Sequence, residues 1–344
     1  MIPVFKPSIR RKEMDSVLSS LVSDQIGPNV IYRELVKELS VLVETFDGFA
    51  LREYDRAVAL ALKALDLQEN DGVVLSALCP FSYYRVIRSL KLTPVPVDVD
   101  SYSMCIDYDA VKTRVKEGAK AVIADGPFGF VPPLTKIAEL GVPLIEDITT
   151  TLGGHTGERA CGTYGDHVII RLEQQDLITS GGGTVVISRK KGGFSSLKQA
   201  AEELPEEAFL SDMNAALAKI QIKELEHYFE RRRELYSFLS AALRRGKHGA
   251  PVQTGESEPV AYSFPVLIEG SVKEVQSYAR KKGVETKRAF SNSLLAAGID
   301  PTGDGSSAFP NAGKLLNSCI LFPLFPRMPK GEADKIARVL TTLP

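Results

Sequence analysis

Short apolar segments alternate with segments of helical periodicity over the first half of the chain, from about Phe46 to Ser188. Apolar runs that lack polar alternation are typical of strands buried on both faces of a parallel sheet. The predicted strands are 73–75, 94–97, 121–124, 143–145, 168–170 and 184–187. The helices predicted between them are 57–67, 83–92, 109–117 and 134–140. The pattern therefore predicts an α/β fold with a mostly parallel sheet covered by helices.

The second half of the chain follows a different pattern, which begins where Ser211 can cap a helix. The apolar residues of this helix recur at helical spacing: Met213, Leu217, Ile220, Leu225 and Phe229. The elements predicted after it are a strand at 261–268 and helices at 272–282 and 331–340. We therefore divide the chain into a large α/β domain (1–210), a long connecting helix (211–245) and a small C-terminal α+β domain (246–344).

Composition excludes several classes of protein. The 344 residues are 44% hydrophobic and hold 42 Lys and Arg against 43 Asp and Glu, for a net charge of −1. This balance indicates a folded globular protein and gives no reason to expect nucleic acid or an anionic membrane as partner. The four cysteines form no C-x-x-C pair, so neither a zinc site nor a disulfide framework is expected. Without a signal-peptide pattern or a long apolar run, we expect a cytoplasmic protein.

Two carboxylates, Glu146 and Asp147, end a predicted strand, and glycine-containing turns follow at 152–154 and 162–166. Acidic side chains at the carboxyl ends of parallel strands are well placed to contact a ligand. The same residue types also cap helices. The spacing alone leaves both interpretations open.

Together with its surroundings, this segment resembles the DegT/DnrJ/StrS family of nucleotide-sugar aminotransferases. The segments that carry the resemblance are 2–9, 94–100, 145–147, 179–183, 211–217, 231–233 and 315–326. The resemblance implies the fold-type-I architecture of pyridoxal-phosphate enzymes, with each active site at the boundary of a homodimer. It also implies a nucleotide-linked sugar as ligand.

In this family an aspartate holds the pyridine nitrogen of the cofactor and a lysine forms the Schiff base. The aspartate falls on Asp147, where a carboxylate would keep the nitrogen protonated. The lysine falls on Gln175 or Asp176, and no lysine occurs between Lys136 and Lys190. A Schiff base needs a primary amine, which neither residue supplies. None of the four histidines falls there either, although the family's sugar dehydratases use histidine at this position.

The Ser-Gly-Thr turn that holds the cofactor phosphate in the family falls on Glu53, Tyr54 and Asp55. Glycine allows backbone N–H groups to approach a phosphate, so Tyr54 is expected to block that approach and to cover part of the ring space. The two flanking carboxylates would repel the anion. A further phosphate-binding serine falls on Arg171 or Ile170. We expect Arg171 to pair with Glu53 or Asp55 across the phosphate position.

The aromatic residue that stacks on the pyridine ring in the family falls near Phe81, which is equally suited to the core. The apolar spacing of Met213, Leu217 and Ile220 agrees with a helix that is buried in a homodimer.

Three functions follow, in order of preference. The first is a degenerate relative that binds no cofactor, does not transaminate and binds a nucleotide-sugar or a protein partner. The second is an enzyme of altered chemistry on a nucleotide-linked keto-sugar, with pyridoxal or pyridoxamine phosphate bound non-covalently or absent. Its acid–base group would be Asp147, Asp176 or Glu173. The third is an ordinary aminotransferase in which Lys190 or Lys191 reaches back past a whole strand.

Overall fold

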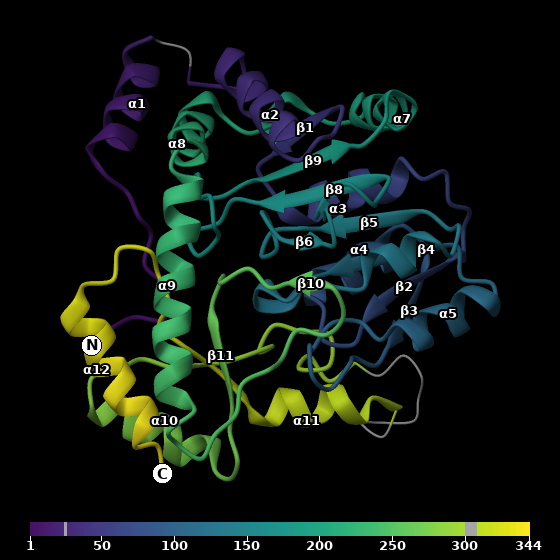
Figure 1. The fold of residues 1–344 in the computed structure, drawn as a ribbon. Coiled ribbons are helices and arrows are strands. Elements are labelled where there is room, and N and C mark those ends of the chain that lie inside the picture. The colour runs from purple at the N-terminus through teal and green to yellow at the C-terminus, as the bar shows by residue number, and fades with distance from the viewer. Residues whose placement is uncertain (24–25, 300–307) are drawn as a thin grey trace.

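The computed structural model describes residues 1–23, 26–299 and 308–344, and a seven-stranded sheet lies at its centre (Figure 1). The strand order is β1-β9-β8-β5-β4-β2-β3. The bounds are β1 Asp47–Leu51, β2 Gly72–Ser76, β3 Thr93–Val97, β4 Ala121–Asp125, β5 Leu144–Asp147, β8 His167–Arg171 and β9 Thr184–Ser188. Neighbouring strands from β3 to β8 are parallel, whereas β9 is antiparallel to β8 and to β1. The predicted α/β fold with a mostly parallel sheet is therefore confirmed.

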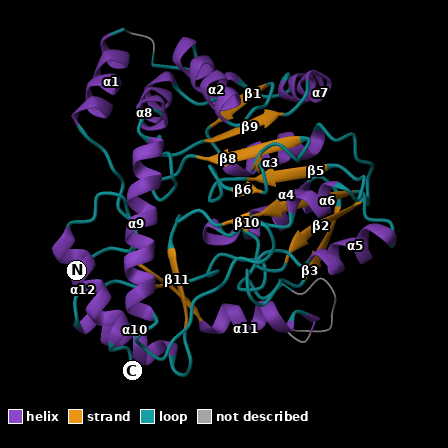
Figure 2. Cartoon of the chain, in the orientation of Figure 1, coloured by secondary structure: helices purple, strands orange, loops and turns teal. Residues whose placement is uncertain are grey.

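Helices cover both faces of this sheet (Figure 2). Val73 and Leu75 of β2 pack in one core, and Val74 between them packs in the core on the opposite face. One core includes residues of α3 (Tyr54–Lys63), α4 (Phe81–Ser89) and α7 (Lys191–Ala201). The other includes residues of α2 (Val30–Leu42), α5 (Tyr108–Lys116), α6 (Leu134–Ala138) and α8 (Asp212–Ile222). Burial on both faces explains why the strands show no polar alternation.

The prediction of a single helix over 211–245 is wrong, because two helices occupy this segment. α8 ends at Ile222, and α9 (Leu225–Leu243) begins after a break at Glu224, whose φ of −102° and ψ of 0° depart from helical values. The Glu224 carboxylate binds the guanidinium of Arg10 at 2.7 Å. The break allows α8 to pack in a core of the large sheet while Leu239 of α9 packs in a C-terminal core.

The C-terminal region holds a three-stranded antiparallel sheet in the order β11-β13-β12. Its elements are β11 Phe264–Leu267, α10 Val272–Lys281, β12 Lys287–Arg288, α11 Pro310–Ser318, β13 Cys319–Phe322 and α12 Lys330–Thr341. The remaining elements are α1 Arg11–Val22, the 3₁₀ turns η1 Pro127–Gly129 and η2 Glu206–Ala208, and a small sheet of β6 His155–Thr156, β7 Arg159–Ala160 and β10 Ser257–Glu258. No helix among the described residues has the length and hydropathy that crossing a bilayer requires.

The buried carboxylate of Asp212, at the first position of α8, fixes the start of α2. It accepts hydrogen bonds from the backbone N–H groups of Asn29 (2.8 Å), Ile31 (3.0 Å) and Tyr32 (2.9 Å). A helix N-terminus leaves its first N–H groups without helical partners, and here a residue about 180 positions away satisfies them. Asp212 therefore ties α2 to α8.

We expect Asp212→Ala to lower the free energy of unfolding by about 1–3 kcal/mol, because buried N–H groups lose their acceptor. Urea denaturation measures this loss. Asp109→Ala, at an exposed position in the first turn of α5, is the matched control and should change stability by less than about 0.5 kcal/mol. Equal losses in the two variants would contradict the anchoring role of Asp212.

Candidate functional site

Charged side chains gather where three neighbouring strands end at the same edge of the sheet. Asp125 ends β4, Asp147 ends β5 and Arg171 ends β8. Asp125 and Asp147 are direct partners in the parallel register. All three line a cavity of about 410 Å³. Ligands bind at this edge of open α/β sheets, so the cavity is the candidate site.

Tyr54 enters this cavity from the first residue of α3. Its hydroxyl donates to Asp147 Oδ2 at 2.5 Å. The hydroxyl of Tyr83 donates to the same oxygen at 2.8 Å, and the two hydroxyls lie 2.8 Å apart. Burial and then the Asp147 carboxylate raise the pKa of both phenols, so both remain donors at neutral pH. The position of Tyr54 in the cavity, with its hydroxyl on Asp147, agrees with the expectation that it covers part of the space of the cofactor ring.

The second oxygen of Asp147 is also bound, because Oδ1 accepts the N–H of Thr149 at 2.9 Å. The carboxylate that the resemblance assigns to the pyridine nitrogen thus has hydrogen bonds from this chain on both oxygens.

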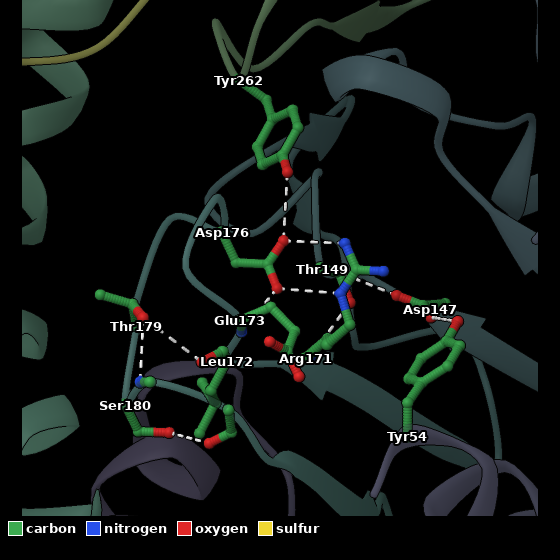
Figure 3. Close-up of polar contacts among 12 residues, drawn as sticks. Tyr54, Asp147, Thr149, Arg171, Leu172, Glu173, Asp176, Thr179, Ser180 and Tyr262 are labelled. Atoms are coloured by element: carbon green, nitrogen blue, oxygen red, sulfur yellow. Dashed lines mark hydrogen bonds and ion pairs between the residues drawn. The ribbon is translucent and has the colours of Figure 1, made fainter. Parts of the chain in front are cut away.

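The prediction that Arg171 pairs with Glu53 or Asp55 is wrong. Its guanidinium binds Asp176 through two bonds of 2.9 Å, one from Nε to Oδ2 and one from an Nη to Oδ1 (Figure 3). The same carboxylate accepts the N–H of Glu173 at 2.8 Å and the hydroxyl of Tyr262 at 3.1 Å. Burial alone would lower the pKa of Arg171, but the bonds to Asp176 raise it above its ordinary value. Asp176 lies five residues from Arg171 in a loop that folds back over the strand end, so it is the closer acceptor.

Glu53 and Asp55 do not line the cavity, contrary to expectation. Glu53 pairs with Arg56 at 3.2 Å, and Asp55 pairs with Arg85. Successive residues at a helix start point about 100° apart, so only Tyr54 of the three points inward. The two carboxylates therefore find cations on the outer side of α3 and α4.

The loop that carries Asp176 is held by α8. Asn214 Nδ2 donates to the carbonyl oxygen of Ser180 at 2.6 Å, and Gln221 Oε1 accepts the N–H of Thr179 at 2.9 Å. Gly183 closes the loop with φ of +111°, where a Cβ would lie 2.6 Å from a methyl carbon of Leu210. Only glycine fits this position without a shift of its neighbours.

Of the other residues expected at the site, some line the cavity and some do not. Of the two residues on which the family lysine could fall, Gln175 lines the cavity, whereas Asp176 binds Arg171. Phe81 does not line it, since its ring stacks on Tyr84 of the same helix at 5.8 Å. Lys190 and Lys191 follow the end of β9 that lies away from the cavity. Within the described residues, the one lysine that lines the cavity is Lys287 of β12, which the sequence patterns did not single out.

Asp125 is the second residue that the sequence reasoning missed. Burial, with a smaller contribution from the Asp147 carboxylate, raises its pKa to about 7. Its Oδ1 is buried and has no hydrogen-bond partner among the described residues. Cys79, Tyr83 and Cys105 also face Asp125, and burial raises the pKa of each, so all three are neutral.

The sheet order and the cavity at the strand ends define the class of the protein as an α/β protein with the fold-type-I aminotransferase architecture. Residues 7–341 match the DegT/DnrJ/EryC1/StrS aminotransferase family, so the chain belongs to that family.

Individual relatives agree with this assignment. A dTDP-4-dehydro-2,3,6-trideoxy-D-glucose 4-aminotransferase of Saccharopolyspora spinosa is 23% identical over 378 residues, which covers 98% of this chain and 95% of the relative. The sugar aminotransferase Spr1654 of Streptococcus pneumoniae in its PLP form superposes with a TM-score of 0.90 at 18% identity, over 99% of this chain and 97% of that one. An E. coli GDP-4-keto-6-deoxy-D-mannose-3-dehydratase with bound hydrated PLP superposes with a TM-score of 0.87 at 16% identity, over 99% of both chains.

The raised pKa of Asp125 predicts a specific pH dependence of stability. The folded protein holds this proton up to about pH 7, whereas the unfolded chain releases it near its ordinary pKa of 3.8. The contribution of Asp125 to stability therefore falls as the pH rises from about 4 to 7. The free energy of unfolding of Asp125→Asn, taken relative to that of the wild type, should therefore rise by on the order of 1–3 kcal/mol between pH 4 and pH 8.

Urea denaturation of both proteins at pH 4, 6 and 8 measures this gain. Asp109→Asn, a change at an exposed carboxylate, is the control and should show the same difference from the wild type at every pH. A pH-independent difference for Asp125→Asn would contradict the assignment of a neutral carboxyl group.

Proposed function

We propose that this protein keeps the family fold but neither forms an internal aldimine nor transaminates. The observation that carries the proposal is the hydrogen bond from Tyr54 to Asp147. The tyrosine side chain starts at the N-terminus of α3, where relatives would hold the cofactor phosphate according to the resemblance, and ends on the carboxylate that would hold the pyridine nitrogen. Its phenol ring and a pyridine ring cannot both lie along this path.

The other groups around the cavity support the same proposal. Arg171 is bound by Asp176 on two nitrogens, so it is not free to bind a phosphate. Gln175 has an amide in place of an amine. The residues present do not fit pyridoxal phosphate as the family holds it.

In place of catalysis by transamination, we propose that the cavity binds a nucleotide-linked sugar. A volume of about 410 Å³ remains beside Tyr54, and aromatic and polar side chains line it. Such a lining suits a small polar ring compound better than a protein partner.

Asp125 favours a second candidate, an enzyme of altered chemistry, because a carboxyl group with a pKa of about 7 can give or take a proton at neutral pH.

We expect wild-type protein incubated with pyridoxal phosphate to show no visible aldimine absorption after gel filtration. Borohydride treatment should leave no pyridoxyl group on a residue of the cavity. Gln175→Lys should behave in the same way, because Tyr54 still occupies the path. Tyr54→Gly should retain more cofactor than either protein, since it opens the start of α3.

Peptide mapping after borohydride distinguishes a cavity lysine from lysines on the surface. Stoichiometric labelling of Lys287 in the wild type, abolished in Lys287→Ala, would contradict the proposal and would favour an aminotransferase with a relocated lysine.

We also propose a homodimer built around the large domain. The outward face of α1 leaves Met14, Leu18 and Val22 exposed by 52%, 57% and 83%, and Met213 of α8 is 37% exposed. Exposed apolar faces of this kind mark interaction surfaces.

Analytical ultracentrifugation at micromolar concentration should therefore show a dimer. Leu18→Glu combined with Val22→Glu should shift the protein toward monomer, whereas Arg114→Glu, on the exposed side of α5, should not. A wild-type monomer would contradict the proposal.

A further inference from the structure

A second, much smaller cavity lies next to the loop that carries Gln175. Its volume is about 20 Å³, which is enough for about one water molecule. Gln175 and Phe5 line both this cavity and the large one at the strand ends, so the two spaces are neighbours. Three separate segments also line the small cavity through Ser8 of the N-terminal segment, Gln221 of α8 and Arg232 of α9.

Arg232 is a buried cation, and only 6% of its surface is exposed. Its Nη1 donates to the carbonyl oxygen of Tyr262 at 2.6 Å, and two further carbonyl oxygens lie at 3.4 Å. No carboxylate in the described part of the chain pairs with it, whereas the flanking Arg231 and Arg233 both bind glutamates. Burial lowers the pKa of Arg232 to about 10, so the guanidinium is still charged at neutral pH. A buried charge is stable only with compensation, and carbonyl dipoles supply only part of it.

Two other buried groups of this cavity lack a hydrogen-bond partner. Gln221 is 2% exposed and Ser8 is 8% exposed. Gln221 Oε1 accepts the N–H of Thr179 at 2.9 Å, but neither Gln221 Nε2 nor the Ser8 hydroxyl has a partner among the residues that the structure describes. An amide nitrogen and a guanidinium can only donate, and a hydroxyl can donate. The cavity therefore favours an occupant that accepts hydrogen bonds.

The remaining charged residues of the cavity leave its surroundings positive. Asp176 also lines it, but both oxygens of this carboxylate bind Arg171, and they accept the N–H of Glu173 and the hydroxyl of Tyr262 as well (Figure 3). Lys6, the other charged lining residue, is exposed and adds a positive charge. Because Arg171 balances the carboxylate, the unpaired guanidinium determines the sign of the local charge, which favours an anion over a neutral water molecule.

We propose that a monatomic anion, chloride in ordinary salt, binds in this small cavity between Ser8, Gln221 and Arg232. A halide ion only accepts hydrogen bonds, and its size is close to that of a water molecule. An anion with several oxygens, such as phosphate, is too large for about 20 Å³. The ion would join the N-terminal segment to α8 and α9 and stabilise the loop that Gln221 holds at Thr179. This inference does not depend on the proposed function, because no ligand of the large cavity takes part.

Thermal denaturation of the wild-type protein in chloride-free buffer tests the site. Sodium chloride or sodium bromide replaces sodium gluconate at constant ionic strength, so that general screening stays the same. We expect each halide to raise the midpoint of unfolding by about 2 °C or more, with saturation, because a ligand that binds only the folded state stabilises it.

Gln221→Glu should remove the halide response, because its carboxylate keeps an oxygen for the N–H of Thr179 and supplies the missing negative charge. Ser8→Ala should raise the halide concentration at half effect by about twofold to tenfold, since one donor is lost. The matched controls are Gln199→Glu and Ser19→Ala, at exposed positions of α7 and α1, and both should respond as the wild type does.

A crystal grown with bromide locates the ion directly, and we expect anomalous density within hydrogen-bond reach of Gln221 Nε2 and Arg232. An ordered water molecule there without anomalous density would overturn the inference. An equal effect of halides and gluconate on the wild type, or a full halide response in Gln221→Glu, would overturn it too. Should Gln221→Glu fail to fold, the Ser8→Ala titration and the bromide density decide. The absorption test with pyridoxal phosphate has no bearing on these outcomes, so the two proposals fail separately.

Discussion

The site depends on one hydrogen bond, which joins the hydroxyl of Tyr54 to the carboxylate of Asp147 at 2.5 Å. A carboxylate at the end of a buried parallel strand must find donors, because an unpaired buried charge is costly. In a cofactor-dependent relative, the ligand would supply one of these donors. Here Tyr54 and Tyr83 supply them from within the chain. The fold therefore retains the acid without requiring an external group to stabilise it.

The same logic applies to the second charged pair. Arg171 ends β8, and a buried guanidinium needs an acceptor of matching geometry. Asp176, near the family position of the lysine, provides that acceptor with both oxygens. The guanidinium and the carboxylate thus balance each other's charge, and Tyr262 closes the network from the C-terminal part of the chain. The pair also explains why Asp176 is poorly suited to act as a free base.

Local sequence patterns and a family register predicted six of the seven sheet strands, their burial on both faces, and the places of Asp147 and Tyr54 near the cofactor position. They did not predict the hydrogen bond between these two residues. It did not allow the partner of Arg171 to be predicted, because the loop after β8 folds back through bonds to Asn214 and Gln221 of α8. β1 was missed because Asp47 and Gly48 interrupt its apolar pattern. Lys287 was missed because its place at the cavity comes from pairing with a strand more than thirty residues later.

Charge balance explains how these features combine into one cavity. The ionised groups at the strand ends have partners within this chain: Arg171 pairs with Asp176, and Asp147 accepts hydrogen bonds from Tyr54, Tyr83 and Thr149. The rings of Phe128 and Phe290 and the cations of Lys287 and Arg288 reach the same cavity from segments that are not part of the strand ends. Because fold and function are separable, a scaffold whose strand-end charges are balanced internally keeps the family architecture, and the chemistry of its cavity is then set by the remaining lining residues.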